Sequence, residues 1–471
     1  MSSVPPHAEG AATPPDAQTA TATRRLVLAL SLSVFLLWAG AGAILPLLPV
    51  YLRQRGGSDA LVGAVMGAFF IAGVVSQYPA GRLADRVGRL QVLIAGLVVC
   101  AVASAGFLLP WGNAATIPLR ALQGVGAGAA EVAALAMVGA SVPLPSRGAA
   151  FGRVYGALIA GLAVGPMVGS LVGAVHMNWI FVTAAVSSLL GIVPVLRYHA
   201  RATASSASTT HGGEASPHGD HIATHGVAGP EHAGREEPSV SPWHNRAFLG
   251  ALVAAAVIGL TGGVYESCWT LLLQDRGAAN WQIGLSWTLF AAPFVAMSRP
   301  AGWLADHFDR RVVAVAGLGT WAAFLAIYPW LHLVWVMLAL AVLEAVSAAV
   351  TYPSVQSMLT GSVPARRSGH AQGLFASSET AATGVSATVG GALFGVALWV
   401  PFLSCAVAAS LLTIVLALLW RKASGRVAGP RSALQVADGH GQFLELTPPP
   451  PGGLQGTYYE FGEAEGDEVL E

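Results

Sequence analysis

The chain has 471 residues, of which 54% are hydrophobic and 10% are charged, and its 24 basic side chains balance 24 acidic ones. Soluble globular domains usually carry about 25% charged residues, so this composition argues against a protein with a water-soluble surface. The three cysteines fall in separate apolar runs, which argues against a disulfide framework and a cysteine metal cage. We therefore expect a membrane protein with no cofactor and no resident metal ion.

Twelve segments are apolar enough to form membrane helices, each of which needs about 20 residues. In chain order they are 26–49, 60–80, 91–110, 115–139, 149–174, 179–196, 247–273, 282–301, 312–330, 332–358, 371–396 and 399–420. The first apolar run is too long for the core of a signal peptide. We expect it to remain in the chain as the first span.

Basic residues gather in alternate loops, which predicts the orientation because cytoplasmic loops are enriched in Lys and Arg. The side that we expect to be cytoplasmic holds Arg24, Arg25, Arg82, Arg86, Arg89, Arg147, Arg153, Arg197, Arg310, Arg311, Arg366, Arg367, Arg421 and Lys422. The opposite loops hold only Arg53, Arg55 and Arg276. This bias predicts a plasma or inner membrane protein with both termini in the cytoplasm.

Polar segments flank and separate the spans. We expect a disordered N-terminus over 1–23, a six-helix bundle over 24–196, a cytoplasmic linker over 197–246, a second bundle over 247–421 and a disordered tail over 422–471. The linker contains seven histidines, and His-rich tracts can bind transition metals. A flexible tether is the simpler interpretation.

The two halves of the chain align without gaps at one offset of 221 residues. That offset carries Gly81 and Asp85 onto Gly302 and Asp306. It also matches Gly42 to Gly263, Gly56 to Gly277, Gly63 to Gly284, Pro79 to Pro300, and Ser141-Val142-Pro143 to Ser362-Val363-Pro364. Each copy holds six spans, so both enter the membrane in the same direction. The sequence therefore predicts an all-α polytopic membrane protein of twelve transmembrane helices in two parallel six-helix repeats.

The loop after the second span has the sequence Gly-Arg-Leu-Ala-Asp-Arg-Val-Gly-Arg over 81–89. It resembles the signature loop of the major facilitator superfamily, whose fold is built from parallel six-span repeats. An aspartate in such a loop can meet a helix N-terminus, whose dipole favours an anion. The resemblance implies a cytoplasmic gate latch. Its residues would be Gly81, Asp85, Arg86, Gly88 and Arg89, with Gly302, Asp306 and Arg310 in the second copy.

The fourth span carries Arg120-x-x-Gln123-Gly124, which is similar to a motif of proton-coupled members of that superfamily. Arg120 and Glu131 lie 11 residues apart and share one helical face. This arrangement suits a proton relay or an internal ion pair. Alternatively, Arg120 extends to the membrane interface and its charge stays in water.

Glycines recur every fourth residue in the fifth span, at Gly161, Gly165 and Gly169, and Pro166 interrupts the run. This pattern resembles the Gly-Pro motif of antiporters in the superfamily, and it is absent from the matching place in the second half. Small residues at this spacing also pack helices closely without further function. The resemblance as a whole implies the twelve-helix drug:proton antiporter type, although the first span lacks an acidic residue.

Four carboxylates lie within predicted spans, where each ionisable group costs about 2.5–3.5 kcal/mol if it faces lipid. We therefore expect them to face the bundle interior or a cavity. Candidates for proton coupling or the substrate pocket are Arg120, Gln123, Glu131, Glu266, Glu344 and Glu379. Glu344 is the strongest of these, because the repeat places neutral Gln123 at its equivalent position, and Glu379 follows. A structural role is the alternative for each acid.

Glu266 lies between Tyr265 and Trp269, a combination that suits binding of an aromatic or cationic solute. An interfacial anchor suits Trp269 equally well. No phosphate-binding loop and no nucleophile–base constellation occurs in the sequence, so we expect neither an ATP-driven pump nor an enzyme, and no nucleic-acid partner.

The sequence favours a monomeric secondary transporter that couples protons to the efflux of small lipophilic molecules, including drugs. The two halves would rock about a site between them. One alternative is an uptake or facilitative carrier for a metabolite such as a sugar or an organic acid. The other is a non-transporting membrane sensor that uses the His-rich linker.

Overall fold

The computed structural model describes residues 17–210, 245–297, 308–364 and 368–421, together with two short strands. Contacts divide the chain into two units, Met1–Ala423 and Ser424–Glu471. In the second unit, the antiparallel strands β1 (Val436–Ala437) and β2 (Phe443–Leu444) pair with each other. They fall inside the segment for which we predicted disorder.

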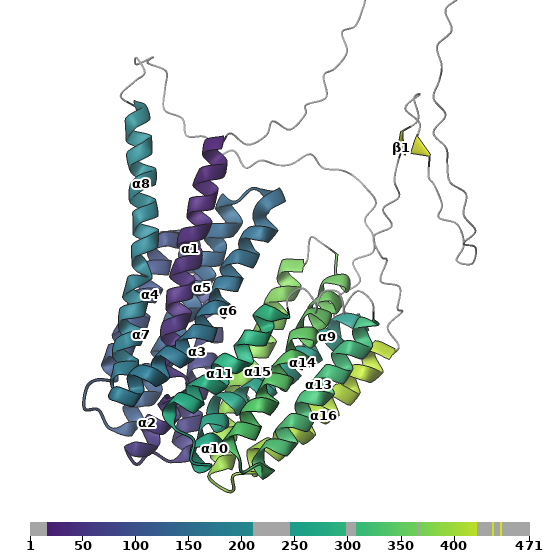
Figure 1. Ribbon diagram of the computed structural model, residues 1–471. Coiled ribbons are helices and arrows are strands. Elements are labelled where there is room, and N and C mark those ends of the chain that lie inside the picture. Colours follow the sequence, from purple (N-terminus) through teal and green to yellow (C-terminus); the bar gives the residue numbers. More distant parts are fainter. Residues whose placement is uncertain are drawn as a thin grey trace, which may run out of the picture. The chain divides into compact units, whose positions relative to one another are not determined.

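The first unit is all-helical in its described residues (Figure 1). Its first half contains α1 (Ala17–Ile44), α2 (Leu48–Gln54), α3 (Asp59–Val87), α4 (Arg89–Gly106), η1 (Asn113–Ala115), α5 (Thr116–Ser141), α6 (Leu144–Val175), α7 (Trp179–Leu190) and α8 (Ile192–Thr210). Its second half contains α9 (Arg246–Val264), η3 (Tyr265–Trp269), α10 (Thr270–Asp275), α11 (Asn280–Ala296), α13 (Arg310–Ile327), η4 (Tyr328–Trp330), α14 (Val334–Gly361), α15 (Ser368–Phe394) and α16 (Val400–Arg421).

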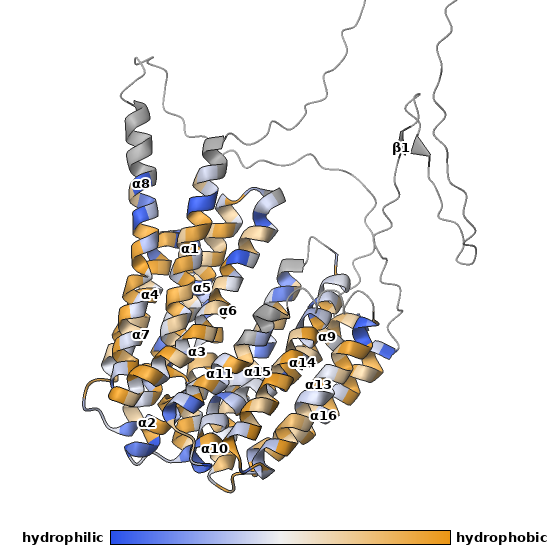
Figure 2. Cartoon of the chain, viewed as in Figure 1, coloured by the Kyte–Doolittle hydropathy of each residue, from blue (hydrophilic) through white to orange (hydrophobic). Residues whose placement is uncertain are grey.

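Ten spans in the described part of the chain are long and apolar enough to cross a membrane. The other two predicted spans are also helical: α11 has 17 residues, and α15 is diluted by Gly, Ser and Thr. Figure 2 shows hydrophobic residues along the helices and hydrophilic residues gathered near their ends. The predicted fold of twelve membrane helices in two six-helix repeats is confirmed.

Two helices extend beyond their predicted limits. The first begins at Ala17, inside the segment predicted to be disordered, and α8 continues to Thr210, into the predicted linker. Alanine has the highest helix propensity, and both extensions contain it repeatedly, so the helices continue past their apolar portions. The linker histidines from 211 to 244 lie outside the described residues.

The repeat is visible in backbone conformation as well as in sequence. Gly56 and Gly277 both adopt the left-handed region, with φ of 77° and 78°. Each turns the chain after a short helix, α2 or α10, and glycine adopts this conformation without the steric cost of a Cβ atom. The matching glycines in the sequence thus mark matching turns in the two halves.

The two halves pack against each other chiefly where α3 meets α15 and α6 meets α11. A Cβ atom at Gly63 of α3 would lie 2.7 Å from Gly391 of α15, and one at Gly284 of α11 would lie 2.8 Å from the carbonyl of Pro166 in α6. Near the other ends of α6 and α15, a Cβ atom at Gly152 or Gly373 would meet nothing within 4 Å in the described residues.

Apolar packing between the halves is likewise tight at one end of the bundle. One buried cluster draws on both halves and includes Leu48, Phe181, Leu272 and Phe402. The other two clusters are each confined to one half. The halves are therefore joined at the end of the bundle that carries α2 and α10, which we call the closed end.

Candidate functional site

A cavity of about 410 Å³ lies between the two halves, within the size range of sites for small molecules. Among the described residues, the first half contributes α6 alone, and the second half contributes residues of α9, η3, α11, α13, η4, α14 and α15. Its ionisable and hydroxyl-bearing lining residues are Tyr155, Thr261, Tyr265, Glu266, Ser286, Tyr328, Glu344, Tyr352 and Glu379. None of the lining residues found in the described part of the chain is Lys, Arg or His. The wall is therefore acidic and aromatic.

The π-turn η3 places three large side chains on this wall. It interrupts the helical span between α9 and α10, and Tyr265, Glu266 and Trp269 all line the cavity. A π-turn adds a residue to one helical turn, and such insertions are frequent at functional sites. Sequence reasoning missed it because hydropathy does not distinguish a π-turn from an α-helix.

Glu344 of α14 is buried, with 3% of its surface exposed. The Tyr265 hydroxyl donates to its Oε1 at 2.6 Å, and the Tyr328 hydroxyl donates to its Oε2 at 2.9 Å. Both carboxylate oxygens are thus held by phenols from other helical segments. The sequence analysis singled out Glu344 but missed Tyr328, which is 16 residues away in the chain.

The two tyrosines belong to an aromatic cluster with Trp269. The Trp269 ring packs edge-on against Tyr328 at 4.8 Å and against Tyr265 at 5.8 Å between centroids. Its indole N–H donates to Ser286 Oγ at 2.9 Å, and 5% of the residue is exposed. Trp269 is therefore part of the cavity wall, and the interfacial-anchor alternative is wrong.

Glu379 of α15 forms a second polar group on the wall. The Tyr352 hydroxyl lies 3.5 Å from its Oε2, and Tyr352 also interacts electrostatically with Tyr155 of α6. Because Tyr155 interacts electrostatically with Glu131 as well, this tyrosine connects a carboxylate of the first half with one of the second. Glu131 itself does not line the cavity.

Arg120 of α5 is buried, with 1% of its surface exposed, so the alternative that it extends to the membrane interface is wrong. Its Nη1 donates to Gln123 Oε1 at 2.9 Å, and its guanidinium lies 4.4 Å from the centre of the Phe69 ring. Arg120 and Glu131 do not pair, because 11 residues separate them by roughly 16 Å along the helix. The acid with which Arg120 interacts electrostatically is Glu266, in the other half.

The signature loop lies at the junction of α3 and α4, where Gly88 has a φ of 114°. Asp85 is exposed, and its carboxylate lies 3.8 Å from Arg89. In the second copy, Arg310 donates to Ser357 Oγ at 2.6 Å, while Gly302 and Asp306 lie outside the described residues. The predicted contact of Asp85 with a helix N-terminus stays a prediction.

The glycines of the fifth span form a packing stripe within the first half. Gly161, Gly165 and Gly169 face α1 so closely that a Cβ atom at any of them would lie within 2.6 Å of an α1 carbonyl oxygen. Pro166 lies inside α6 and contacts Gly42 of α1. This part of the motif fixes α6, the helix through which the first half reaches the cavity.

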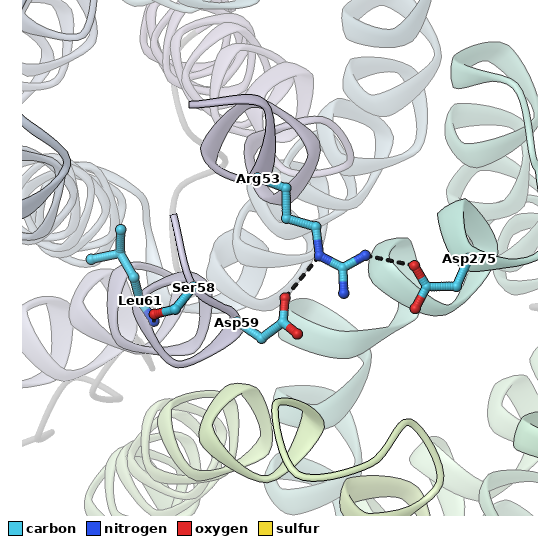
Figure 3. Close-up of polar contacts among 5 residues, drawn as sticks. All are labelled: Arg53, Ser58, Asp59, Leu61 and Asp275. Atoms are coloured by element: carbon cyan, nitrogen blue, oxygen red, sulfur yellow. Dashed lines mark hydrogen bonds and ion pairs between the residues drawn. The ribbon is translucent and has the colours of Figure 1, made fainter. Parts of the chain in front are cut away.

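An ion cluster bridges the halves at the closed end (Figure 3). Arg53 of α2 donates from Nε to Asp59 of α3 at 2.8 Å and from Nη1 to Asp275 of α10 at 2.7 Å. The side chains are partly exposed, at 21%, 21% and 36%. Sequence reasoning took Arg53 only as a loop base, because its two acids come from different helices.

A family model described as Major Facilitator Superfamily matches residues 30–267 and 247–446. The chain belongs to the Major Facilitator Superfamily. Among curated relatives, the inner membrane transport protein YajR of Escherichia coli is 41% identical over 100 residues, which are 20% of this chain and 21% of YajR. An uncharacterized transporter of this superfamily type from Yersinia pestis is 41% identical over 83 residues. These matches span about a fifth of each relative's length.

Solved transporters share the fold. A bacterial homologue of the human lysosomal transporter Spinster, in an inward-facing state, superposes with a TM-score of 0.61 at 15% identity, covering 85% of this chain and 96% of its own. A peptide transporter in complex with sulfate gives 0.63 at 16% identity over 84% and 94%, and the nucleoside transporter NupG gives 0.61 at 14% over 84% and 99%. At these identities the likeness concerns the fold alone.

Proposed function

We propose that this superfamily member exports small lipophilic molecules in exchange for protons, by alternating access between its two halves. The observation that carries the proposal is Glu344, a buried carboxylate on the wall of the cavity between the halves. A carboxyl there can alternate between charged and neutral forms. Its two tyrosine donors hold it at the cavity surface, where a proton and a substrate can compete for it.

The cavity wall supports a lipophilic substrate. Aromatic and aliphatic side chains make up most of the lining, while the charged members are the acids Glu266, Glu344 and Glu379. Such a wall favours apolar molecules and tolerates a positive charge, because aromatic faces and carboxylates both attract cations. It disfavours organic acids, so the metabolite-carrier alternative is the weaker one for anionic substrates.

The direction of transport follows from the expected topology. With both termini in the cytoplasm of a plasma or inner membrane, the closed end would face outward, and the cavity would accept molecules from the cytoplasm or the inner leaflet. The signature loop around Asp85 would then lie at the cytoplasmic ends of the helices. Rocking would bring this loop against the second half as the closed end opens. We propose that a single chain completes this cycle.

Transport in proteoliposomes tests the proposal. A pH gradient, acidic on the side of the closed end, should drive accumulation of a lipophilic dye by the wild type. Glu344→Gln, which removes the ionisable group but keeps its shape, should abolish the effect of the gradient while retaining the wild-type melting temperature. Dye movement that ignores the gradient in the wild type would overturn proton coupling and favour a facilitative carrier.

A further inference from the structure

Arg120 of the first half interacts electrostatically with Glu266 of the second half, and we propose that they are the charge pair that links occupancy of the cavity to opening of the closed end. This inference rests on the proposed function for its biological sense. It assigns a positioning role to Arg120, which does not line the cavity, and a sensing role to Glu266, which does.

The burial of Arg120 demands a counter-charge. A guanidinium does not lose its proton in proteins, and an unpaired buried charge is strongly destabilising. Gln123 and Phe69, which contact Arg120, are both neutral, and the Arg120 Nε has no hydrogen-bond partner in the described structure. The positive charge is therefore positioned and shielded by the first half but not neutralised by it.

Glu266 supplies the missing negative charge from the second half. It lies on η3, its Oε2 is buried without a hydrogen-bond partner in the described residues, and Arg120 is the charged group with which it interacts. The pair is closer to an electrostatic contact than to a hydrogen-bonded salt bridge, since it is not among the direct ion pairs of the described chain. An electrostatic attraction of this kind can weaken without the loss of a hydrogen bond between the two residues.

The other acids around η3 are already engaged elsewhere. The elements packed against η3 include α3, α10 and α15, whose acids nearest the closed end and the cavity are Asp59, Asp275 and Glu379. Arg53 forms ion pairs with the first two, and Tyr352 lies beside the third. Glu344, on α14, is held by Tyr265 and Tyr328. Glu266 is thus the cavity acid that interacts with the buried positive charge of the first half.

The chemistry of the switch is a single proton transfer. When Glu266 is ionised, its attraction to Arg120 across the boundary favours contact of the halves at the closed end. When a proton from water binds the carboxylate, or a cationic substrate sits against it, that attraction falls and Arg120 is left as an uncompensated charge. The cost of leaving that charge buried then favours separation of the halves, which admits water to Arg120.

The Arg120–Glu266 pair has no counterpart at the equivalent positions of the repeat. The repeat offset places Leu45 at the position of Glu266 and Ala341 at the position of Arg120, so the mirror-image pair does not exist. A pair that merely held two similar bundles together could have been duplicated with them. A pair that occurs once, with its acid on the cavity wall, suits a sensor.

Distance measurements across the closed end test the inference without any substrate. Spin labels at Ala60 and Ala279, both exposed and on opposite halves, report the population of separated halves in a background whose three buried cysteines are replaced. In the wild type this population should rise as pH falls. Glu266→Gln and Arg120→Gln should each change the ratio of closed to separated states about fivefold or more and remove its pH dependence.

Two further variants serve as controls for this test. Arg120→Lys preserves the charge and should retain the pH response, whereas Arg197→Gln, at an exposed arginine of α8, should leave the distribution unchanged. If Arg120→Gln fails to fold, Glu266→Gln alone decides. A wild-type pH response in well-folded Glu266→Gln would overturn the inference.

The outcome separates this inference from the proposed function. If Glu266→Gln loses the pH response and the wild type moves no dye under a pH gradient, the switch is upheld and the proposed export is defeated. Gradient-driven export that depends on Glu344, with an unaltered conformational response in Glu266→Gln, would uphold the export and defeat the switch.

Discussion

The two six-helix halves share a backbone plan. Arg55 after α2 donates to the carbonyl of Trp111 at 2.8 Å, and its repeat equivalent Arg276 after α10 donates to the carbonyl of Pro329 at 2.6 Å. These contacts tie equivalent turns together in both halves, next to the glycines with matching φ values. These residues, which recur in both halves, therefore stabilise the same turn in each half.

The same two halves differ at the cavity. At the repeat positions of Tyr265, Glu266, Trp269, Tyr328, Glu344 and Glu379, the first half carries Ile44, Leu45, Leu48, Phe107, Gln123 and Leu158. Most of these first-half residues are buried in apolar clusters. The comparison teaches that the first half fills most of these positions with apolar side chains, while the second half carries the three acids that line the cavity in the described residues.

The largest expected effect comes from moving the acid between the halves. The double variant Gln123→Glu with Glu344→Gln keeps the number of carboxylates, yet it should lose at least about 90% of gradient-driven dye transport. At position 123 the carboxylate would pair with Arg120, which already contacts that side chain at 2.9 Å, and it would lack both phenol donors. Restored transport in proteoliposomes would show that the asymmetry is dispensable.

Removing the phenol donors should have the next largest effect. Tyr265→Phe combined with Tyr328→Phe leaves both oxygens of Glu344 without these partners, and each hydrogen bond to a charged group contributes about 1.5–3 kcal/mol. We expect initial transport rates to fall about tenfold or more. The matched change in the first half, Phe107→Tyr, adds a hydroxyl at a residue that does not line the cavity and should not lower these rates. Equal losses in the two variants would contradict the assignment.

Glycine substitutions compare the two ends of the boundary between the halves. Gly63→Val would force side-chain atoms into the backbone of α15, and overpacking of this kind costs about 1–3 kcal/mol. We expect the spin-label distances across the closed end to shift toward separated halves. Gly152→Val, where a Cβ atom would meet no neighbouring element within 4 Å in the described residues, should leave them unchanged, and a shift of similar size there would mean that crowding is not the cause.

The smallest effect is expected from the ion cluster of Figure 3. Its side chains are partly exposed, and exposed pairs contribute about 0.2–1 kcal/mol each. Arg53→Gln removes both pairs and should therefore lower the ratio of closed to separated states by about 2- to 30-fold at low ionic strength. The difference from wild type should shrink in about 1 M salt, because the Debye length there is roughly 3 Å. A salt-independent loss would indicate that Arg53 acts through packing on Phe394 instead.

The amino-acid sequence by itself determined the membrane class, the spans and the repeat. In lipid, the backbone N–H and C=O groups of an apolar run must form hydrogen bonds within the chain, so the run becomes a helix. Glycines such as Gly56 and Gly277 mark turns that few other residues allow. It also singled out Glu344 as an acid in a span with a neutral repeat partner. These features are local or periodic, so they can be read along the chain.

Only the tertiary structure decided what each polar residue contacts. The sequence suggests a proton relay or an ion pair between Arg120 and Glu131 on one helix, but in the folded chain Arg120 interacts electrostatically with Glu266, 146 residues away. Tyr328 reaches Glu344, and Arg53 reaches Asp275, for the same reason: hydropathy fixes how helices form, whereas their packing determines which side chains meet. The π-turn at Tyr265–Trp269 depends on that packing as well, since an extra residue in a helical turn is stabilised by what the displaced side chains contact.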